Sequence, residues 1–200
     1  MNMMAQQQEQ GYLIPLEEYL KVGLHIGTKF RTKYMSNFIY KTRPDGLVVL
    51  NIQEIDKRIK LAANLISQYK PEDILVVCRR ENGWKPVSLF AKYTGIKVFA
   101  GRYPPGVLTN PNLKTFMESK LMIIVDPWVD KNAIKDAIKV GIPVIALCDT
   151  YNESNNIDLV VPCNNKGKKS IGLIFWIFAR EYLNTQGKNF TAKLDEFLEE

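Results

Sequence analysis

The chain has 200 residues, 46% of them hydrophobic and 24% charged, and its formal net charge at pH 7 is +6. This length suits one soluble globular domain, and the longest apolar run, residues 171–179, is far shorter than the roughly 20 residues that cross a bilayer. The three cysteines form no C-x-x-C pair, so neither a disulfide framework nor a zinc ribbon is expected, and the compartment should be reducing and cytoplasmic.

The first part of the chain predicts a tail, a short helix and a strand. Residues 1–11 lack the basic start and apolar core of a secretory signal, and we expect them to form a disordered tail. Pro15 stands at the start of a short helix that runs through Val22. A turn at 43–46 then leads into a buried strand at 47–50.

Strands and helices alternate in the next part of the chain. Apolar runs bounded by proline, glycine or aspartate predict strands, and apolar residues at helical spacing predict the helices between them. The predicted order is βαβαβ, with strands at 47–50, 74–78 and 97–100 and helices at 52–69 and 85–93. Three prolines and two glycines make 101–111 an irregular connection that should expose Arg102 and Tyr103, and 115–120 is a short helix at most.

The segment 121–150 reads as a complete strand, helix, strand unit. Residues 121–125 form the apolar run that a strand buried on both faces requires, and Asp130 is placed to cap the helix that follows. Gly141 is the expected left-handed residue past the end of that helix, and the second strand starts at Ile142. Because one helix joins two buried strands, the strands must run parallel.

The remaining elements complete the predicted fold. A strand at 159–161 precedes a helix at 170–184 that is apolar on every side, so this helix should lie between the sheet and another layer. We therefore predict a Rossmann-like (flavodoxin-like) three-layer α/β domain over residues 12–184, with a mostly parallel sheet flanked by helices. An acidic tail, 185–200, follows, and a short helix at 191–199 within it needs a docking surface, which a partner could supply.

Positive charge is concentrated in one segment. Residues 29–43 carry five basic residues and no acidic one. A solvated surface normally mixes acids with its bases, but here the bases alternate with Phe30, Tyr34, Phe38 and Tyr40. Phosphates attract arginine and lysine, and unpaired bases stack on aromatic rings, so the segment indicates an RNA-contacting arm, although Phe38 can instead belong to the core.

Smaller basic groups lie in segments that read as loops or strand ends, where they can converge on one face. Taken singly, such a group is most often a solvated surface. We predict that together with the arm they bind RNA, although the single histidine is equally well explained by hydrogen bonds within its own loop. The predicted residues are His25, Lys29, Arg31, Lys33, Tyr34, Lys41, Arg43, Arg79, Arg80, Lys85, Arg102, Lys166, Lys168 and Lys169.

An enzyme site would lie at the carboxyl ends of the parallel strands, where open α/β sheets bind ligands. Asp126 and Asp149 end neighbouring predicted strands and could form a carboxylate pair, but an aspartate in that place more often caps a helix or closes a turn. The chain contains no G-x-G-x-x-G, G-x-x-x-x-G-K-[ST] or G-x-S-x-G motif. We expect no catalytic residue, cofactor, metal or small-molecule substrate.

Several motifs in combination resemble those of a known family. They are GLHIGTKF, DGLVVLNIQEI, AGRYPPGVLTNP, VDP before a short helix, GIPVIALCDT and IDLVVPCNN, in the family's order. They resemble the universal S-two family of small-subunit ribosomal proteins over about residues 12–185. Only residues 54–70 stand where bacterial members carry a long helical hairpin, and the chain stops at Glu200 without the acidic extension of eukaryotic members, so the archaeal type fits best.

The resemblance implies a doubly wound domain that has lost nucleotide chemistry and is a structural part of the small ribosomal subunit. Its partners would be small-subunit rRNA and neighbouring ribosomal proteins, with no membrane, and the loops HIGTKFRTKY and GRYPPGVLTN would make the main contacts. One alternative is a cytoplasmic Rossmann-like enzyme that acts on a phosphorylated metabolite through Arg79, Arg102 and the strand-end aspartates. Another is a free RNA-binding or adhesion module.

Overall fold

The computed structural model describes residues 11–198, so the tail expected at 1–11 lies, apart from Gly11, outside the described residues. The strands are β1 (Ile39–Thr42), β2 (Val48–Leu50), β3 (Ile74–Cys78), β4 (Lys97–Ala100), β5 (Leu121–Ile124), β6 (Val144–Cys148) and β7 (Leu159–Pro162). The α-helices are α2 (Leu16–Lys21), α3 (Ile52–Ser67), α4 (Trp84–Thr94), α5 (Lys131–Val140), α6 (Lys168–Thr185) and α7 (Leu194–Leu198). Short 3-10 helices lie at Met35–Phe38, Pro71–Asp73 and Glu81–Gly83.

Five parallel strands form the main sheet, in the order β4-β3-β5-β6-β7. Every residue of β3, β5 and β6 is buried, which explains why these strands read as continuous apolar runs instead of alternating ones. The strand order reverses between β3 and β5, because the chain first moves from β3 to β4 and then returns to the other side of β3. The predicted Rossmann-like α/β fold with a mostly parallel sheet is confirmed.

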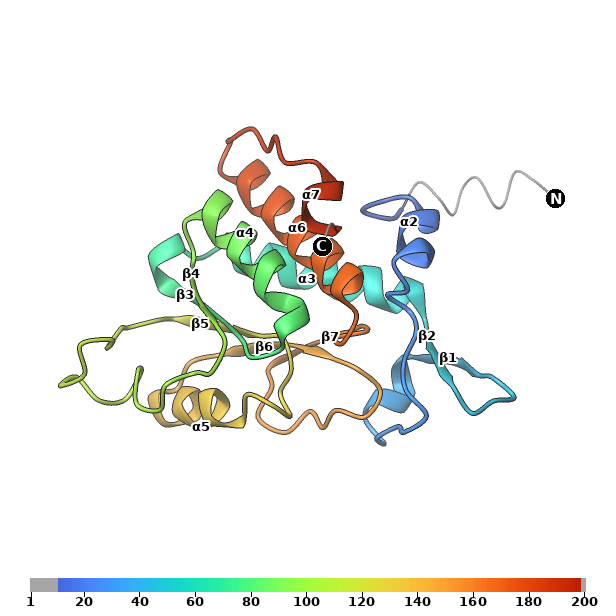
Figure 1. Ribbon diagram of the computed structural model, residues 1–200, viewed down its shortest axis with the longest axis horizontal. Coiled ribbons are helices and arrows are strands. Elements are labelled where there is room, and N and C mark those ends of the chain that lie inside the picture. The colour runs from blue at the N-terminus through green and yellow to red at the C-terminus, as the bar shows by residue number, and fades with distance from the viewer. Residues whose placement is uncertain (1–10, 199–200) are drawn as a thin grey trace.

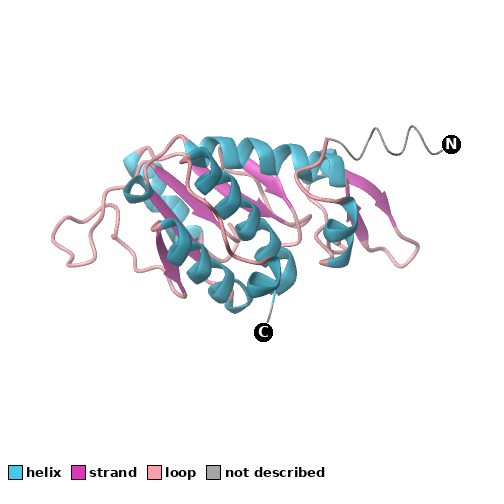
Figure 2. Ribbon diagram, turned by 90° about the horizontal axis from the view of Figure 1, so that it is seen from above, coloured by secondary structure: helices cyan, strands magenta, loops and turns pink. Residues whose placement is uncertain are grey.

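Helices cover both faces of this sheet (Figures 1 and 2). The helices α3, α4 and α6 lie on one face, and α5 lies on the other. The crossovers through α4 and α5 run in opposite directions along the sheet, so right-handed connections place them on opposite faces. The apolar helix α6 packs against α3, α4 and α7, which is why 11 of its 18 residues are buried.

The predicted βαβαβ order is confirmed along the chain, as β2, α3, β3, α4 and β4, but its first strand does not belong to the main sheet. The strand β2 pairs antiparallel with β1 in a separate two-stranded hairpin and does not join the main sheet. The connection between them is the turn around Gly46, where Gly46 N donates to Arg43 O (2.9 Å) and Arg43 N donates to Leu47 O (2.8 Å). Such a short connection permits only antiparallel pairing, and β1 was not predicted from the sequence.

The short helix α7 near the end of the chain docks on the chain itself. Phe197 of α7 is fully buried, and its ring stacks on Tyr93 of α4 with centroids 6.2 Å apart. The Tyr93 hydroxyl donates to Glu196 Oε2 (2.8 Å), and Trp176 Nε1 of α6 donates to Ala192 O (3.1 Å). The expected docking surface for this short helix is therefore formed by α4 and α6.

The long connection between β4 and β5 departs from the prediction at one residue. Tyr103 is buried and not exposed, and its hydroxyl donates to Asp136 Oδ2 of α5 (3.3 Å). Residues 115–120, predicted to be a short helix at most, contain no helix. Within residues 11–198, no helix is both long enough and apolar enough to cross a membrane.

Candidate nucleic-acid interface

The connections that follow the strands of the main sheet all start at one edge, because the strands run parallel. We call this the carboxyl edge; it comprises the residues directly after β3, β4, β5, β6 and β7, up to the first turn of the next helix where one follows. Half of the residues predicted to bind RNA lie there. They are Arg79, Arg80 and Lys85 after β3, Arg102 after β4, and Lys166, Lys168 and Lys169 after β7.

The start of the basic arm is hydrogen-bonded to the same edge. Thr32 N donates to Thr150 O (2.9 Å), Thr32 Oγ1 donates to Asn152 O (3.0 Å), and Thr28 N donates to Thr150 Oγ1 (3.0 Å). A Cβ at Gly27 would meet the Thr150 side chain, so glycine permits this close approach. The exposed side chains Lys29, Arg31 and Lys33 are thereby brought to the carboxyl edge.

The rest of the arm forms a second basic group on the β1–β2 hairpin. Figures 1 and 2 show this hairpin projecting beyond the body of the molecule. Lys41 lies beside the exposed Tyr40, with its ammonium 5.9 Å from the ring centroid, and Arg43 pairs with Asp45 (Nη2 to Oδ2, 3.2 Å). Tyr34 is 39% exposed, whereas Phe38 is buried, as the core interpretation of Phe38 anticipated.

Arg79 and Arg102 line one hollow of about 180 Å³ with Asp130 at the start of α5. Asp130 holds the N-cap position, but its side chain does not cap the helix. Its Oδ2 instead accepts a hydrogen bond from Arg79 N (3.3 Å), and burial raises the pKa of Asp130 to about 6. In place of the expected side-chain cap, Asp130 links the start of α5 to the connection after β3.

Arg80 differs from the other basic residues because it forms an internal ion pair. Its guanidinium pairs with Asp126, with Nε 2.6 Å from Oδ2, and Nη2 donates to the Tyr151 hydroxyl (2.8 Å). The Asp126 side chain is fully buried, whereas that of Arg80 is 27% exposed. The charge of Arg80 is thus largely compensated within the chain, and an RNA contact by this residue stays a prediction.

The strand-end aspartates form turns and a buried polar network. Asp126 Oδ1 accepts from Trp128 N (2.9 Å) and from Asn152 Nδ2 (3.1 Å), and the Tyr151 hydroxyl donates to Asp126 Oδ2 (2.8 Å). Asp149 Oδ1 accepts from Thr150 N (2.6 Å), and burial raises the pKa of Asp149. Each aspartate therefore fixes the connection in which it lies. Both carboxylate oxygens of Asp126 accept hydrogen bonds from other residues.

His25 lies between the hairpin and the turn after β7. Its carbonyl oxygen accepts from Leu50 N (2.8 Å), and the preceding Leu24 O accepts from Asn164 N (2.9 Å). The half-buried ring has no partner for Nδ1 among residues 11–198, and burial lowers the pKa of His25, with a weaker opposing effect from the Tyr19 backbone. Burial therefore favours the neutral form of the histidine, and its contact with RNA stays a prediction.

Two aromatic residues at the carboxyl edge were missed from the sequence. Trp128 follows β5 and is 56% exposed, and Tyr151 follows β6, with ring centroids 6.2 Å apart. Lys131 lies over Trp128 (4.6 Å to the centroid) and Lys166 lies over Tyr151 (4.0 Å). Their position directly after predicted strands was the available signal, but only the sheet brings them together.

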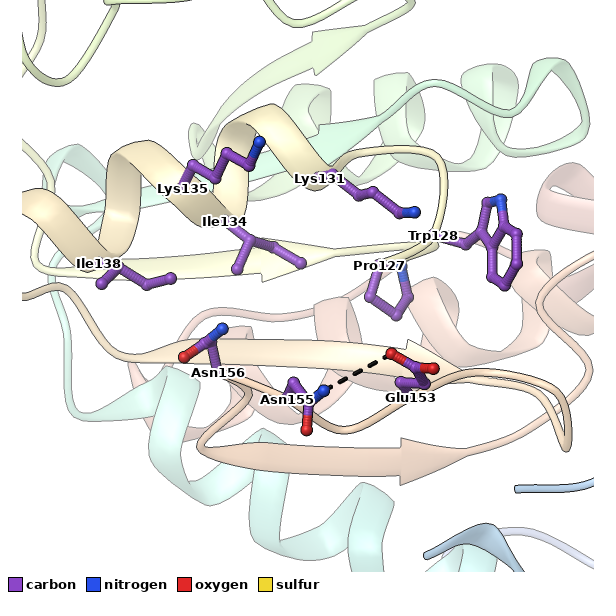
Figure 3. Close-up of a pocket in the computed structure, with 9 residues that line it drawn as sticks. All are labelled: Pro127, Trp128, Lys131, Ile134, Lys135, Ile138, Glu153, Asn155 and Asn156. Atoms are coloured by element: carbon purple, nitrogen blue, oxygen red, sulfur yellow. Dashed lines mark hydrogen bonds between the residues drawn. The ribbon is translucent and has the colours of Figure 1, made fainter. Parts of the chain in front are cut away.

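A hollow of about 290 Å³ separates α5 from the turn at 153–156 (Figure 3). Its walls are the apolar Ile134 and Ile138 and the basic Lys131 and Lys135, and Asn155 Nδ2 donates weakly to Glu153 Oε2 across 3.5 Å. It contains none of the predicted site residues. No three potential metal ligands gather anywhere in the part of the chain that the structure describes.

Comparison with known proteins gives this surface a context. The family model described as "Ribosomal protein S2" matches residues 19–120 and 112–184. The chain is similar to proteins named "Small ribosomal subunit protein uS2". That of Nanoarchaeum equitans is 50% identical over 175 residues (88% of this chain, 87% of the relative), and that of Pyrobaculum calidifontis is 47% identical over 187 residues (92% and 90%). That of Methanococcus maripaludis is 45% identical over 194 residues (96% and 88%).

These relatives carry the name of a ribosomal protein, so the metabolite-enzyme alternative is set aside and the chain is not an enzyme. The resemblance read from the motifs is confirmed, including its archaeal character. The chain therefore belongs to the ribosomal protein S2 family, the S-two family that its motifs indicated.

Proposed function

We propose that this chain is a structural constituent of the small ribosomal subunit in the cytoplasm, where it binds rRNA and neighbouring ribosomal proteins. Its relatives are named as proteins of the small ribosomal subunit, which supports assembly of this chain into that subunit. The carboxyl edge is the surface that we assign to rRNA, and the hairpin with Lys41 and Arg43 is a second contact.

The observation that carries this proposal is the convergence of basic residues from distant parts of the chain. The hydrogen bonds of Thr28 and Thr32 with Thr150 and Asn152 join the arm to the edge that already holds the basic residues after β3, β4 and β7. The aspartates directly after β5 and β6 are buried. The exposed acids in these connections are Glu81, Glu118, Glu153 and Asp158, and the second and fourth of these lie near the start of the next strand, away from the carboxyl edge. Basic residues outnumber them, so the edge attracts a polyanion.

The mode of binding follows from the side chains. Lysine and arginine on exposed connections contact phosphates irrespective of base, which positions the protein on folded RNA without reading a long sequence. Specificity then comes from the shape of the rRNA and from neighbouring proteins. No reaction is part of this function.

The test is binding of purified small-subunit rRNA over a range of salt concentrations. Reversing Lys29, Arg31 and Lys33 to glutamate should weaken binding and reduce the slope of log affinity against log salt by about 2 to 3, because each lost phosphate contact removes roughly 0.7–0.9. A matched control reverses three exposed lysines at the opposite edge. Lys70 and Lys139 precede β3 and β6, and Lys97 is the first residue of β4.

Both variants have the same formal net charge of 0, because each reverses three of the charges that make +6. The proposal predicts a much larger loss of affinity for the first variant than for the control. Equal losses would show that only net charge matters and would contradict the assignment of the carboxyl edge.

A further inference from the structure

A half-open hollow of about 360 Å³ lies where the arm meets the carboxyl end of β6. Its walls include the rings of Phe30, Trp128 and Tyr151, and Arg31 and Lys166 stand at its rim. It is separate from the hollow of Figure 3, although Trp128 borders both; that figure shows the indole at the end of the neighbouring hollow, beside Lys131. Its size is within the range of small-ligand sites.

The aromatic walls are exposed but held in place. Phe30 is 79% exposed and Trp128 is 56% exposed. Several large aromatic rings exposed at one place on a surface are typical of a binding site. The Tyr151 hydroxyl is fixed between Arg80 Nη2 and Asp126 Oδ2, and Trp128 N is fixed by Asp126 Oδ1. The ion pair thus fixes the hydroxyl end of the Tyr151 ring and the backbone from which the Trp128 ring projects, so a planar group that enters the hollow meets a partly prearranged surface.

Both charged side chains that line this hollow are basic. None of the described residues that line the hollow is acidic, and Arg31 and Lys166 are basic. The Lys166 ammonium already lies over the Tyr151 ring at 4.0 Å, so the flexible side chain covers the face that a ligand would use. A ligand that suits this hollow is aromatic and carries negative charge close to its ring.

Resting on the proposed function, we propose that this hollow binds one unpaired nucleotide of the small-subunit rRNA. Its base stacks on the Trp128 ring and contacts the Tyr151 ring, which is tilted by 59° to the indole, and Phe30 covers the base from the arm. Its phosphates lie against Arg31 and Lys166, which swings away from the tyrosine ring as the base enters. An aromatic side chain of a neighbouring protein could stack on the rings but would leave Arg31 and Lys166 without an anion, so the chemistry favours a nucleotide.

The first experiment uses intact small subunits that contain the chain. Short-wavelength ultraviolet light joins stacked bases to aromatic side chains, and mass spectrometry then identifies the linked peptide and nucleotide. We expect one rRNA nucleotide linked to a peptide that contains Phe30, Trp128 or Tyr151. A link from these peptides to a protein, or no link while the chain is present in the subunit, would overturn the nucleotide site but leave the proposed function intact.

The second experiment uses Trp128→Leu, which removes the ring at an exposed position where folding tolerates the change. The linked base is probed with dimethyl sulfate or a carbodiimide, according to its identity. Its reactivity should rise at least about fivefold, the low end of the effect of losing one aromatic stack. The control is Leu61→Ala in α3, outside the carboxyl edge, where the side chain is 54% exposed.

The control should leave the reactivity of the base unchanged, and both variants should enter subunits at normal occupancy. Unchanged reactivity in subunits that contain Trp128→Leu would overturn the stacking site alone. Absence of the wild-type chain from small subunits would instead overturn the proposed function, so the two failures are distinguishable.

Discussion

The buried pair of Arg80 and Asp126 should make a large, coupled contribution to stability. Asp126→Asn removes the charge-assisted hydrogen bonds of a fully buried carboxylate, and Arg80→Met leaves that carboxylate without its cation. Breaking a buried pair typically costs 3–5 kcal/mol, but Arg80 is 27% exposed and Asp126 keeps donors from Trp128, Tyr151 and Asn152. We therefore expect each single variant to lower the free energy of unfolding by about 2–4 kcal/mol.

The double variant should be more stable than the two single losses together imply, by at least about 1 kcal/mol, because each single change leaves an unmatched group. Urea unfolding followed by circular dichroism measures the four free energies. The exposed pair Arg43 and Asp45, with side chains 53% and 51% exposed, gives a matched cycle in which coupling should stay within about 0.5 kcal/mol. Additive losses at Arg80 and Asp126 would refute the reasoning.

Three further variants test other parts of the structure. Gly172→Ala places a Cβ against the Phe197 carbonyl, so it should detach α7 and lower the free energy of unfolding by about 1–3 kcal/mol. Amide hydrogen exchange around residue 197 should become faster, and unchanged exchange would contradict the docking of α7. Asp130→Asn should raise the free energy of unfolding, because the raised pKa of Asp130 makes its ionisation costly in the folded state. The gain should be absent near pH 4 and reach about 2–3 kcal/mol above pH 6. If urea unfolding gives the same difference between variant and wild type across this pH range, the reasoning is wrong. Gly27→Ala should push the arm from Thr150 and weaken rRNA binding several-fold in filter assays, and full affinity would show that this attachment is dispensable.

Local sequence patterns predicted the main sheet because its strands are short apolar runs between clear turn signals, and β3, β5 and β6 are buried throughout. They could not predict the hairpin, since the residues of β1 were assigned to an RNA-binding arm and strand pairing is a tertiary property. Tyr103 was assigned to an exposed loop, and only its contact with Asp136, 33 residues away, explains its burial.

The candidate interface shows the same division. Charge and composition predicted that lysines and arginines lie on the connections, and in the structure the parallel topology brings many of them to one edge. The partner of Arg80 lies 46 residues away and no local pattern indicates it, so a free cation was expected where an ion pair exists. Trp128 and Tyr151 form a hollow with Phe30 only after the arm folds back onto β6, which is why composition identified Phe30 alone.

The most direct test of the account is sedimentation of a native cell lysate at physiological salt, with the position of this chain followed by a specific antibody. The account predicts that the chain migrates with the small ribosomal subunit and is released only at high salt, as expected for a contact dominated by phosphates. Migration as a free protein of about 22.9 kDa in cells with intact small subunits would contradict the central claim.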